Sequence, residues 1–260
     1  MSITIALFIG CWLATCLLTP AVMRLARRMD AVDRGGYRKI SLREVPLLGG
    51  LAVAFPLSML CLGVGVAGFL VNVYWQYLFV HHREWFDSLY TLAGARYDCV
   101  TLALGGIAIL ILGIVDDTKA LRARWKLVGQ IAVATFVCLS GHVLTSVAIP
   151  LFGVVEFGRE VGVILTMLWV VGVINAFNLI DGIDGLATGI ALVGAVALVA
   201  LSIIQDAAFV TYAGAALAGS LLAFLLFNFP PARVFLGDTG SMFIGYCLAI
   251  LSLIGAHKAL

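Results

Sequence analysis

The sequence predicts an all-α fold, a polytopic bundle of transmembrane helices. Three observations lead to this class. Of the 260 residues, 63% are hydrophobic and 12% are charged, whereas a soluble domain carries roughly 25% charged residues. The mean hydropathy is +1.12. Apolar windows of about 20 residues, the length that crosses a bilayer, recur along the whole chain.

About eight apolar windows are expected to be spans of a single integral-membrane domain, residues 1–260. The first window lacks the basic flank and the cleavage site of a signal peptide, which indicates a retained span. Neither a repeat of fixed period nor a linker divides the chain. The expected spans are residues 3–22, 47–70, 99–115, 127–149, 161–178, 186–204, 207–227 and 240–257.

The basic residues indicate the orientation of these spans. Of the 16 Lys and Arg residues, seven follow the first window, four follow the third and one follows the seventh. The positive-inside rule assigns this side to the cytoplasm. With eight spans, both termini are then expected on the outer side. Five acids from three separate loops come to the cytoplasmic side: Asp116, Asp117, Asp181, Asp184 and Asp238.

The pair Asp116-Asp117 directly follows an uninterrupted apolar run that ends at Val115. Carboxylates beside hydrocarbon are expensive, so such acids indicate a functional site. Two adjacent carboxylates repel each other unless a cation or a shared proton relieves them. Mg²⁺ suits this position because it prefers carboxylates and brings substrate phosphates with it. The alternative is an interfacial pair balanced by Lys119 and Arg122.

A second motif occupies residues 175–185, where Asn175, Asn178, Asp181 and Asp184 recur at every third residue. On an α-helix each such step shifts the position by about 60°. The four side chains are therefore expected to line a curved wall, or a helix loosened at the two glycines of the motif. A polar turn also uses Asn, Asp and Gly, but it does not require two Asn residues inside the preceding span.

The third motif is Phe235-Leu-Gly-Asp238-Thr-Gly-Ser241, at the entrance of the last window. Its glycines let backbone N–H groups approach a phosphate, and Phe235 is able to stack on a nucleobase. A helix N-cap by Asp238 or Thr239 explains only part of the motif.

Other classes of protein are less consistent with the sequence. The net charge of +2 gives no indication of nucleic-acid binding, and the chain has neither a zinc-site spacing nor a Walker loop. A cation-coupled transporter would have acids near the middle of the membrane and an inverted repeat. The acids here are expected at one membrane face, and no repeat is visible.

The three motifs together resemble the polyprenyl-phosphate N-acetylhexosamine-1-phosphate transferases of glycosyltransferase family 4, with the closer likeness to their WecA-like branch. Segments 32–39 and 45–50 are similar to the first cytoplasmic loop of that family. The order, spacing and topology of the motifs agree over essentially the whole chain. The motifs are Asp116-Asp117, Asn175-Ala-Phe-Asn178-Leu-Ile-Asp181-Gly-Ile-Asp184-Gly-Leu and Phe235-Leu-Gly-Asp238-Thr-Gly-Ser.

The resemblance implies a reaction and a set of roles. A phosphate oxygen of a polyprenyl phosphate attacks the β-phosphorus of a UDP-N-acetylhexosamine, and UMP leaves. Asp238 and Asp181 are expected to bind Mg²⁺, with Mn²⁺ as the alternative. Asp116 and Asp117 are the expected catalytic pair, with Asp116 as the candidate base. The expected substrate-binding residues are Asn175, Asn178, Asp184, Phe235, Asn228, Lys39 and Arg43.

The resemblance also implies a cellular setting. The expected location is the bacterial inner membrane, with the active site on the cytoplasmic face and a glycan of the cell envelope as the end product, of the O-antigen, enterobacterial common antigen or teichoic-acid type. UDP-N-acetylglucosamine is the favoured donor and undecaprenyl phosphate the acceptor. The lipid bilayer is a partner, nucleic acid is not, and a homodimer is left open. Another UDP-N-acetyl sugar is the nearest alternative.

Members of the family continue beyond the position of Leu260, with further spans and a late cytoplasmic loop that carries a His-rich motif. The chain is therefore expected to be incomplete at its C-terminus. An inactive, truncated membrane fragment is the alternative to an active enzyme.

Overall fold

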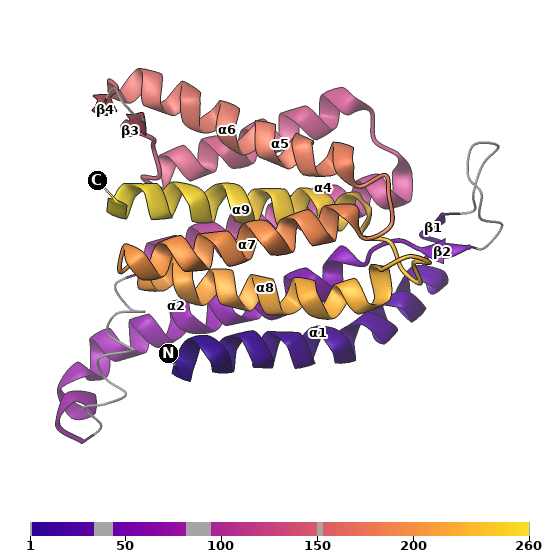
Figure 1. The fold of residues 1–260 in the computed structure, drawn as a ribbon, viewed down its shortest axis with the longest axis horizontal. Coiled ribbons are helices and arrows are strands. Elements are labelled where there is room, and N and C mark those ends of the chain that lie inside the picture. Colours follow the sequence, from indigo (N-terminus) through magenta and orange to yellow (C-terminus); the bar gives the residue numbers. More distant parts are fainter. Residues whose placement is uncertain (1, 34–43, 82–94, 150–152, 260) are drawn as a thin grey trace.

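The computed structural model describes residues 2–33, 44–81, 95–149 and 153–259. These residues form eight α-helices and two small antiparallel sheets (Figure 1). The all-α class is therefore confirmed. The helices are α1 (Ser2–Arg28), α2 (Gly50–His81), α4 (Arg96–Lys119), α5 (Ala123–Leu139), α6 (Arg159–Ile180), α7 (Leu186–Ile204), α8 (Ala208–Asn228) and α9 (Gly237–Ala259). The strands are β1 (Val32–Asp33), β2 (Val45–Pro46), β3 (Ser146–Ile149) and β4 (Gly153–Glu156).

Each expected span falls on one helix. Within the described residues, α1, α4, α6, α7, α8 and α9 are long and apolar enough to cross a membrane. Helix α5 has 17 residues, and the described apolar part of α2 is the stretch Gly50–Val66. The chain is thus a multi-pass membrane protein, while eight crossings and outer termini stay predictions.

The fourth expected span, residues 127–149, is wrong at its C-terminal end. Helix α5 ends at Leu139, and Gly141 follows in the left-handed region with φ +94°, the conformation that commonly ends a helix. Residues 146–149 instead form β3, which pairs with β4 in the register Ser146 to Glu156. Hydropathy failed here because a short apolar run of four residues suits a strand as well as a helix.

Helices α8 and α9 form the centre of the bundle. The apolar window of α9 is 89% buried and that of α8 is 78% buried, against 22% for α1 and for α6. Helix α9 packs mainly against α4 and α6, and α8 packs against α1 and α7. The outer helices therefore present most of their apolar side chains to the surroundings, as expected of a bundle in lipid.

Small residues bring three helices together at one end of the bundle. A Cβ atom on Gly113 of α4 would lie 2.4 Å from Cα of Thr239 in α9, and one on Gly50 of α2 would lie 2.1 Å from Cα of Gly240. Only glycine allows such close approach of backbones. The N-terminus of α9 is therefore set directly against α2 and α4.

The two ends of the bundle carry different strands, turns and helix ends. The sheet of β1 and β2 lies at one end, with the turns that join α4 to α5, α6 to α7 and α8 to α9 (Figure 1). Helix α1 begins and α9 ends toward the opposite end, where β3 and β4 lie. This arrangement brings the three acidic motifs to one end and the two chain termini to the other.

Candidate active site

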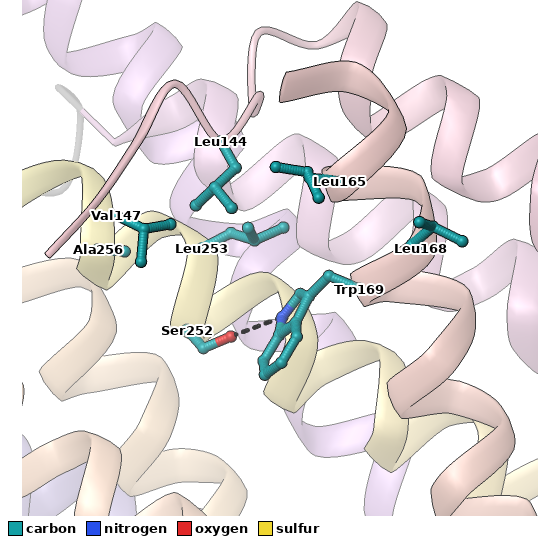
Figure 2. Close-up of a pocket in the computed structure, with 8 residues that line it drawn as sticks. All are labelled: Leu144, Val147, Leu165, Leu168, Trp169, Ser252, Leu253 and Ala256. Atoms are coloured by element: carbon teal, nitrogen blue, oxygen red, sulfur yellow. Dashed lines mark hydrogen bonds between the residues drawn. The ribbon is translucent and has the colours of Figure 1, made fainter. Parts of the chain in front are cut away.

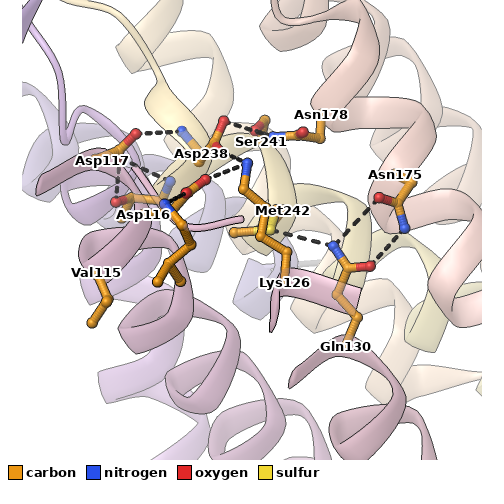
Figure 3. Close-up of polar contacts among 12 residues, drawn as sticks. Val115, Asp116, Asp117, Lys126, Gln130, Asn175, Asn178, Asp238, Ser241 and Met242 are labelled. Atoms are coloured by element: carbon orange, nitrogen blue, oxygen red, sulfur yellow. Dashed lines mark hydrogen bonds and ion pairs between the residues drawn. The ribbon is translucent and has the colours of Figure 1, made fainter. Parts of the chain in front are cut away.

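Four helices bring polar side chains to the turn-rich end of the bundle (Figure 3). Asp116 and Asp117 lie in the last turn of α4, and Asn178 lies near the end of α6. Asp238 is the second residue of α9, and Lys126 lies in the first turn of α5. Residues that are up to 122 positions apart in the sequence are joined here by hydrogen bonds.

Asp238 is held from three sides. Its Oδ1 accepts a hydrogen bond from Asn178 Nδ2 at 2.7 Å, and its Oδ2 contacts Nζ of Lys126. Its backbone N–H donates to Oδ1 of Asp117 at 2.9 Å. Since each contact comes from a different helix, the orientation of this carboxylate is set by the packing of α4, α5 and α6 around α9.

Lys126 joins Asp238 to Asp116, because its Nζ also contacts Oδ2 of Asp116. The Asp116 side chain is only 4% exposed, and its Oδ1 accepts a hydrogen bond from the backbone N–H of Leu121 at 2.7 Å. A carboxylate this deeply buried requires a partner charge. The cation that balances Asp116 is therefore Lys126, and the expected alternative partners, Lys119 and Arg122, are not the observed ones.

Sequence reasoning missed Lys126 as a site residue. A signal was available, because a lysine in the first turn of an apolar helix opposes the positive end of the helix dipole. Such a residue calls for an acid nearby. Which acid it meets depends on the reversal of the chain between α4 and α5, where Ala120 has a left-handed conformation with φ +48°.

Asp117 caps helix α9 from the neighbouring helix. Its Oδ1 accepts from the backbone N–H of Asp238, and its Oδ2 accepts from Thr239, both from the backbone N–H at 3.0 Å and from Oγ1 at 2.6 Å. A carboxylate at a helix N-terminus satisfies free N–H groups and complements the helix dipole. Gly237, with φ +70°, allows this approach, since a Cβ there would lie 2.6 Å from Oδ2 of Asp117.

The amides of the second motif point to different neighbours. Asn178 Nδ2 also donates to Oγ of Ser241 at 3.1 Å, so Asn178 faces α9. One turn deeper, Asn175 Nδ2 donates to Oε1 of Gln130 at 2.6 Å, so Asn175 faces α5. Gln130 is 1% exposed and was not expected from the sequence. Helix α6 ends at Ile180, so the two acids of the motif lie in the following turn.

Asp184 and Asn228 hold the loop that joins α8 to α9. Asp184 Oδ2 accepts from the backbone N–H of Ala232 at 3.0 Å. Asn228 is 3% exposed; its Oδ1 accepts from Gly185 N–H and Thr188 Oγ1, and its Nδ2 donates to the Val234 carbonyl at 2.9 Å. These contacts give both side chains a part in shaping the loop; their substrate contacts stay predictions.

The backbone of Phe235 is paired with the glycine-rich start of α2. Its N–H donates to the Pro46 carbonyl at 2.9 Å, and its carbonyl accepts from Gly49 N–H at 3.0 Å. A Cβ on Gly49 would lie 2.4 Å from that carbonyl oxygen. Segment 45–50, which resembles the first cytoplasmic loop of the family, thus holds the backbone at Phe235 in place by hydrogen bonds.

A cleft of about 1070 Å³ opens beside these groups. Arg233 is the only basic residue among its described lining residues. The predicted site residues that line it are Asp117, Asp181, Asp184, Asn228, Phe235 and Asp238. Asn175, Asn178 and Asp116 are not among its lining residues, and Lys39 and Arg43 lie outside the part of the chain that the structure describes.

Asp181 is the acid of the cleft that has no hydrogen-bond or ion-pair partner among the described residues. Burial, and then the negative charges of Asp238 and Asp117, raise the pKa of Asp181 to about 8. The protonated form of this carboxyl group is therefore favoured more strongly than in a free aspartate. A cation placed among the three acids would favour its ionised form.

The donor groups fit a hard divalent cation that keeps several water ligands. Within the described residues, no three His, Cys, Asp or Glu side chains are grouped closely enough to hold a metal on their own. Two carboxylate oxygens, Asp116 Oδ2 and Asp238 Oδ2, nevertheless converge on one point, the Nζ of Lys126. Mg²⁺ is commonly bound by one or two protein carboxylates together with water and substrate phosphates.

A second cavity, of about 580 Å³, lies between α6, α9 and the segment that enters β3 (Figure 2). Its lining is apolar apart from Ser252 and the indole of Trp169, and Trp169 Nε1 donates to Ser252 Oγ at 3.1 Å. None of its lining residues in the described part of the chain is charged, so it does not suit a phosphate. The acidic cleft is the candidate active site.

Fold and site define a multi-pass membrane protein with an acidic cleft at one end of its helix bundle. The model of the family described as glycosyl transferase family 4 matches residues 99–256, more than half of the chain. The chain belongs to this family, and the family predicted from the motifs is confirmed.

The chain is also similar, over most of its length, to curated proteins. A probable undecaprenyl-phosphate N-acetylglucosaminyl 1-phosphate transferase of Bacillus subtilis (strain 168) is 35% identical over 97% of this chain and 63% of its own length. A decaprenyl-phosphate N-acetylglucosaminephosphotransferase of Mycobacterium leprae (strain TN) is 33% identical over 92% of this chain and 58% of its own length. A phospho-N-acetylmuramoyl-pentapeptide-transferase of Desulforudis audaxviator (strain MP104C) is 31% identical over 94% and 73%. The chain thus spans about three fifths of the first two relatives.

Proposed function

We propose that this protein transfers N-acetylhexosamine 1-phosphate from a UDP-sugar to a polyprenyl phosphate and releases UMP. The observation that carries the proposal is the convergence of Asp116, Asp117 and Asp238 with Lys126 beside a cleft that also contains Asp181. The names of the relatives support the class of reaction, since they describe polyprenyl-phosphate hexosamine-phosphate transferases. We take UDP-N-acetylglucosamine as the donor and undecaprenyl phosphate as the acceptor.

The acids suit a transfer between two phosphates. This chemistry needs little covalent participation by the protein and much neutralisation of charge. Asp116 and Asp238 would hold Mg²⁺ through the oxygens that converge on Lys126, with Asp181 beside them. When bound, the metal would supply the positive charge that the diphosphate requires.

The protein's own side chains would have distinct roles in this reaction. Asn178 orients the Asp238 carboxylate, and Asp117 fixes the start of α9, so the acid is preorganised before substrate binds. Phe235 lines the cleft and offers a ring for the uracil base. Asp116, the base expected from the resemblance, would serve here as a metal ligand, because its Oδ1 accepts from Leu121 N–H and its Oδ2 faces the proposed metal position.

The place of the cleft supports a lipid acceptor. It lies at one end of the apolar helices, where a long isoprenoid would stay in the bilayer while its phosphate meets a water-soluble nucleotide sugar. We assign this end to the cytoplasmic face of the bacterial inner membrane, because the basic loops lie there.

The test is UMP release by membranes that contain residues 1–260, supplied with UDP-N-acetylglucosamine, undecaprenyl phosphate and Mg²⁺. Product should depend on the lipid and disappear with EDTA. Asp238→Asn should lower the rate at least about 100-fold, because it removes a charge from the proposed metal site. The matched control is Asp206→Asn, an exposed acid in the turn between α7 and α8, away from the cleft.

Each outcome of this assay has a meaning. Metal- and lipid-dependent UMP that is lost only in Asp238→Asn would support the proposal. Folded, inserted protein that releases no UMP would contradict the proposed activity for this chain. A panel of UDP-N-acetyl sugars in the same assay then identifies the donor.

A further inference from the structure

Lys126 forms ion pairs with two acids that belong to different helices. Its Nζ contacts Oδ2 of Asp116 in α4 and Oδ2 of Asp238 in α9 (Figure 3). The lysine sits in the first turn of α5, where the helix dipole disfavours a positive charge. Its position is therefore explained by the two carboxylates rather than by the helix that carries it.

Each of the two carboxylates contacts Lys126 with one oxygen and accepts a hydrogen bond with the other. Asp116 Oδ1 accepts from Leu121 N–H at 2.7 Å, and Asp238 Oδ1 accepts from Asn178 at 2.7 Å. A divalent cation bound by these acids would thus approach the same two oxygens that Lys126 Nζ now contacts. A divalent cation and the ammonium group cannot occupy the same point between these two oxygens, and their like charges repel, so the ammonium group must move when the cation binds there.

The lysine can leave while its helix stays in place. Gln130, one turn further along α5, is bonded to Asn175 of α6 and donates to the sulfur of Met242 in α9 at 3.5 Å. These contacts anchor the backbone of α5. The Lys126 side chain has four rotatable carbons and keeps 22% of its surface exposed, so the ammonium group has a path out of the acid pair.

We propose that Lys126 is an internal counter-cation, which neutralises Asp116 and Asp238 in the metal-free protein and is displaced when a divalent cation binds. The proposal rests on the proposed function, because the cation is the metal of that reaction. The displaced ammonium group is released beside the cleft at the step when the phosphate groups of a substrate require positive charge. The lysine thereby weakens metal binding and assists turnover.

The first test measures cation affinity in purified protein, residues 1–260, without any substrate. Mn²⁺ binding, followed by electron paramagnetic resonance, should be about tenfold or more tighter in Lys126→Met than in wild type, because the competing charge is gone. UMP release by the same variant should fall. Lys119→Met is the matched control, since Lys119 is an exposed lysine at the end of α4, and its affinity should stay near that of wild type.

The second test uses wild-type protein and does not depend on the folding of a variant. The protein is treated with an amine-reactive reagent in EDTA or in Mg²⁺, and labelling of Lys126 is measured by mass spectrometry relative to Lys119. Two carboxylates shield the amine in the metal-free state. Addition of Mg²⁺ should therefore raise the labelling of Lys126 several-fold relative to Lys119.

The results separate this proposal from the proposed function. Equal or weaker Mn²⁺ affinity in Lys126→Met, or labelling of Lys126 that does not rise with Mg²⁺, would overturn the counter-cation while metal-dependent UMP release could still stand. Absence of Mn²⁺ binding in both proteins would overturn the counter-cation together with the metal site. Tighter binding with slower turnover is the combination that supports it.

Discussion

At the scale of single residues, the site is organised around the orientation of one carboxylate. Asp238 is contacted by Asn178, Lys126 and Asp117. None of these three residues belongs to α9, the helix that carries Asp238. Replacing a group that orients a metal ligand typically lowers metal affinity or activity by about 10–100-fold. The residues around Asp238 are therefore the first places where small changes should have large effects.

Replacement of Asn178 by Ala should free Oδ1 of Asp238 and loosen its orientation. We expect Mn²⁺ affinity to fall about 10–100-fold, the range found for partners of metal ligands, and UMP release to fall with it. Asn178→Asp also removes the amide donor and places a like charge 2.7 Å from the acid, so UMP release should fall in this variant too. Electron paramagnetic resonance and the UMP assay measure the two effects, and unchanged affinity in Asn178→Ala would contradict the positioning role.

Asp117→Asn should destabilise the start of α9. The amide keeps one acceptor oxygen but loses the charge, while Asp238 N–H, Thr239 N–H and the Thr239 hydroxyl all need acceptors. Loss of a cap costs about 1 kcal/mol, which corresponds to a Tm lower by about 2–4 °C for a protein of this size. Thermal unfolding in detergent, with Asp206→Asn as the control, measures the change; equal Tm values would contradict the cap.

At the scale of elements, the site depends on how closely α4 approaches α9. Gly113→Ala would place a Cβ 2.4 Å from Cα of Thr239, a backbone atom that cannot rotate away. We expect a loss of about 1–3 kcal/mol of stability and a displaced N-terminus of α9. Gly172→Ala in α6 is the matched control, because no atom lies within 4 Å of the added methyl.

Helices α5 and α6 are joined by an amide pair, in which the Gln130 side chain is buried. Gln130 and Asn175 form a hydrogen bond of 2.6 Å, and a buried partner left alone costs about 1–3 kcal/mol. The single changes Gln130→Leu and Asn175→Leu should each lower the free energy of unfolding, while the double change should cost less than the sum of both. A double-mutant cycle by thermal unfolding measures this coupling, and strict additivity would argue against the pair.

At the scale of the whole molecule, the two ends of the bundle are expected on opposite sides of the membrane. Thr118→Cys lies at the end that carries the acids, and Val154→Cys lies on β4 at the other end; both positions are exposed. A membrane-impermeant maleimide should label Val154→Cys in intact cells and Thr118→Cys only after permeabilisation. The reverse result would invert the predicted topology.

The sequence alone determined the class of the molecule and the residue types of the site. Acids such as Asp116 and Asp238 are conspicuous in an apolar chain, because charge beside hydrocarbon is costly and is kept for a reason. Apolar windows likewise identified the helices that the described residues form. Hydropathy could not distinguish residues 146–149 as a strand, since it measures apolar character and not backbone pairing.

Only the tertiary structure decided the partners. Lys126 bridges Asp116 and Asp238, Asp117 caps α9, and Gln130 pairs with Asn175 because α4, α5, α6 and α9 meet at one end of the bundle. A buried acid or amide requires a hydrogen-bond or ion-pair partner, and this requirement can be inferred from a sequence. The identity of the partner depends on which helix faces are brought into contact, and that follows from the packing of small residues such as Gly113 against α9.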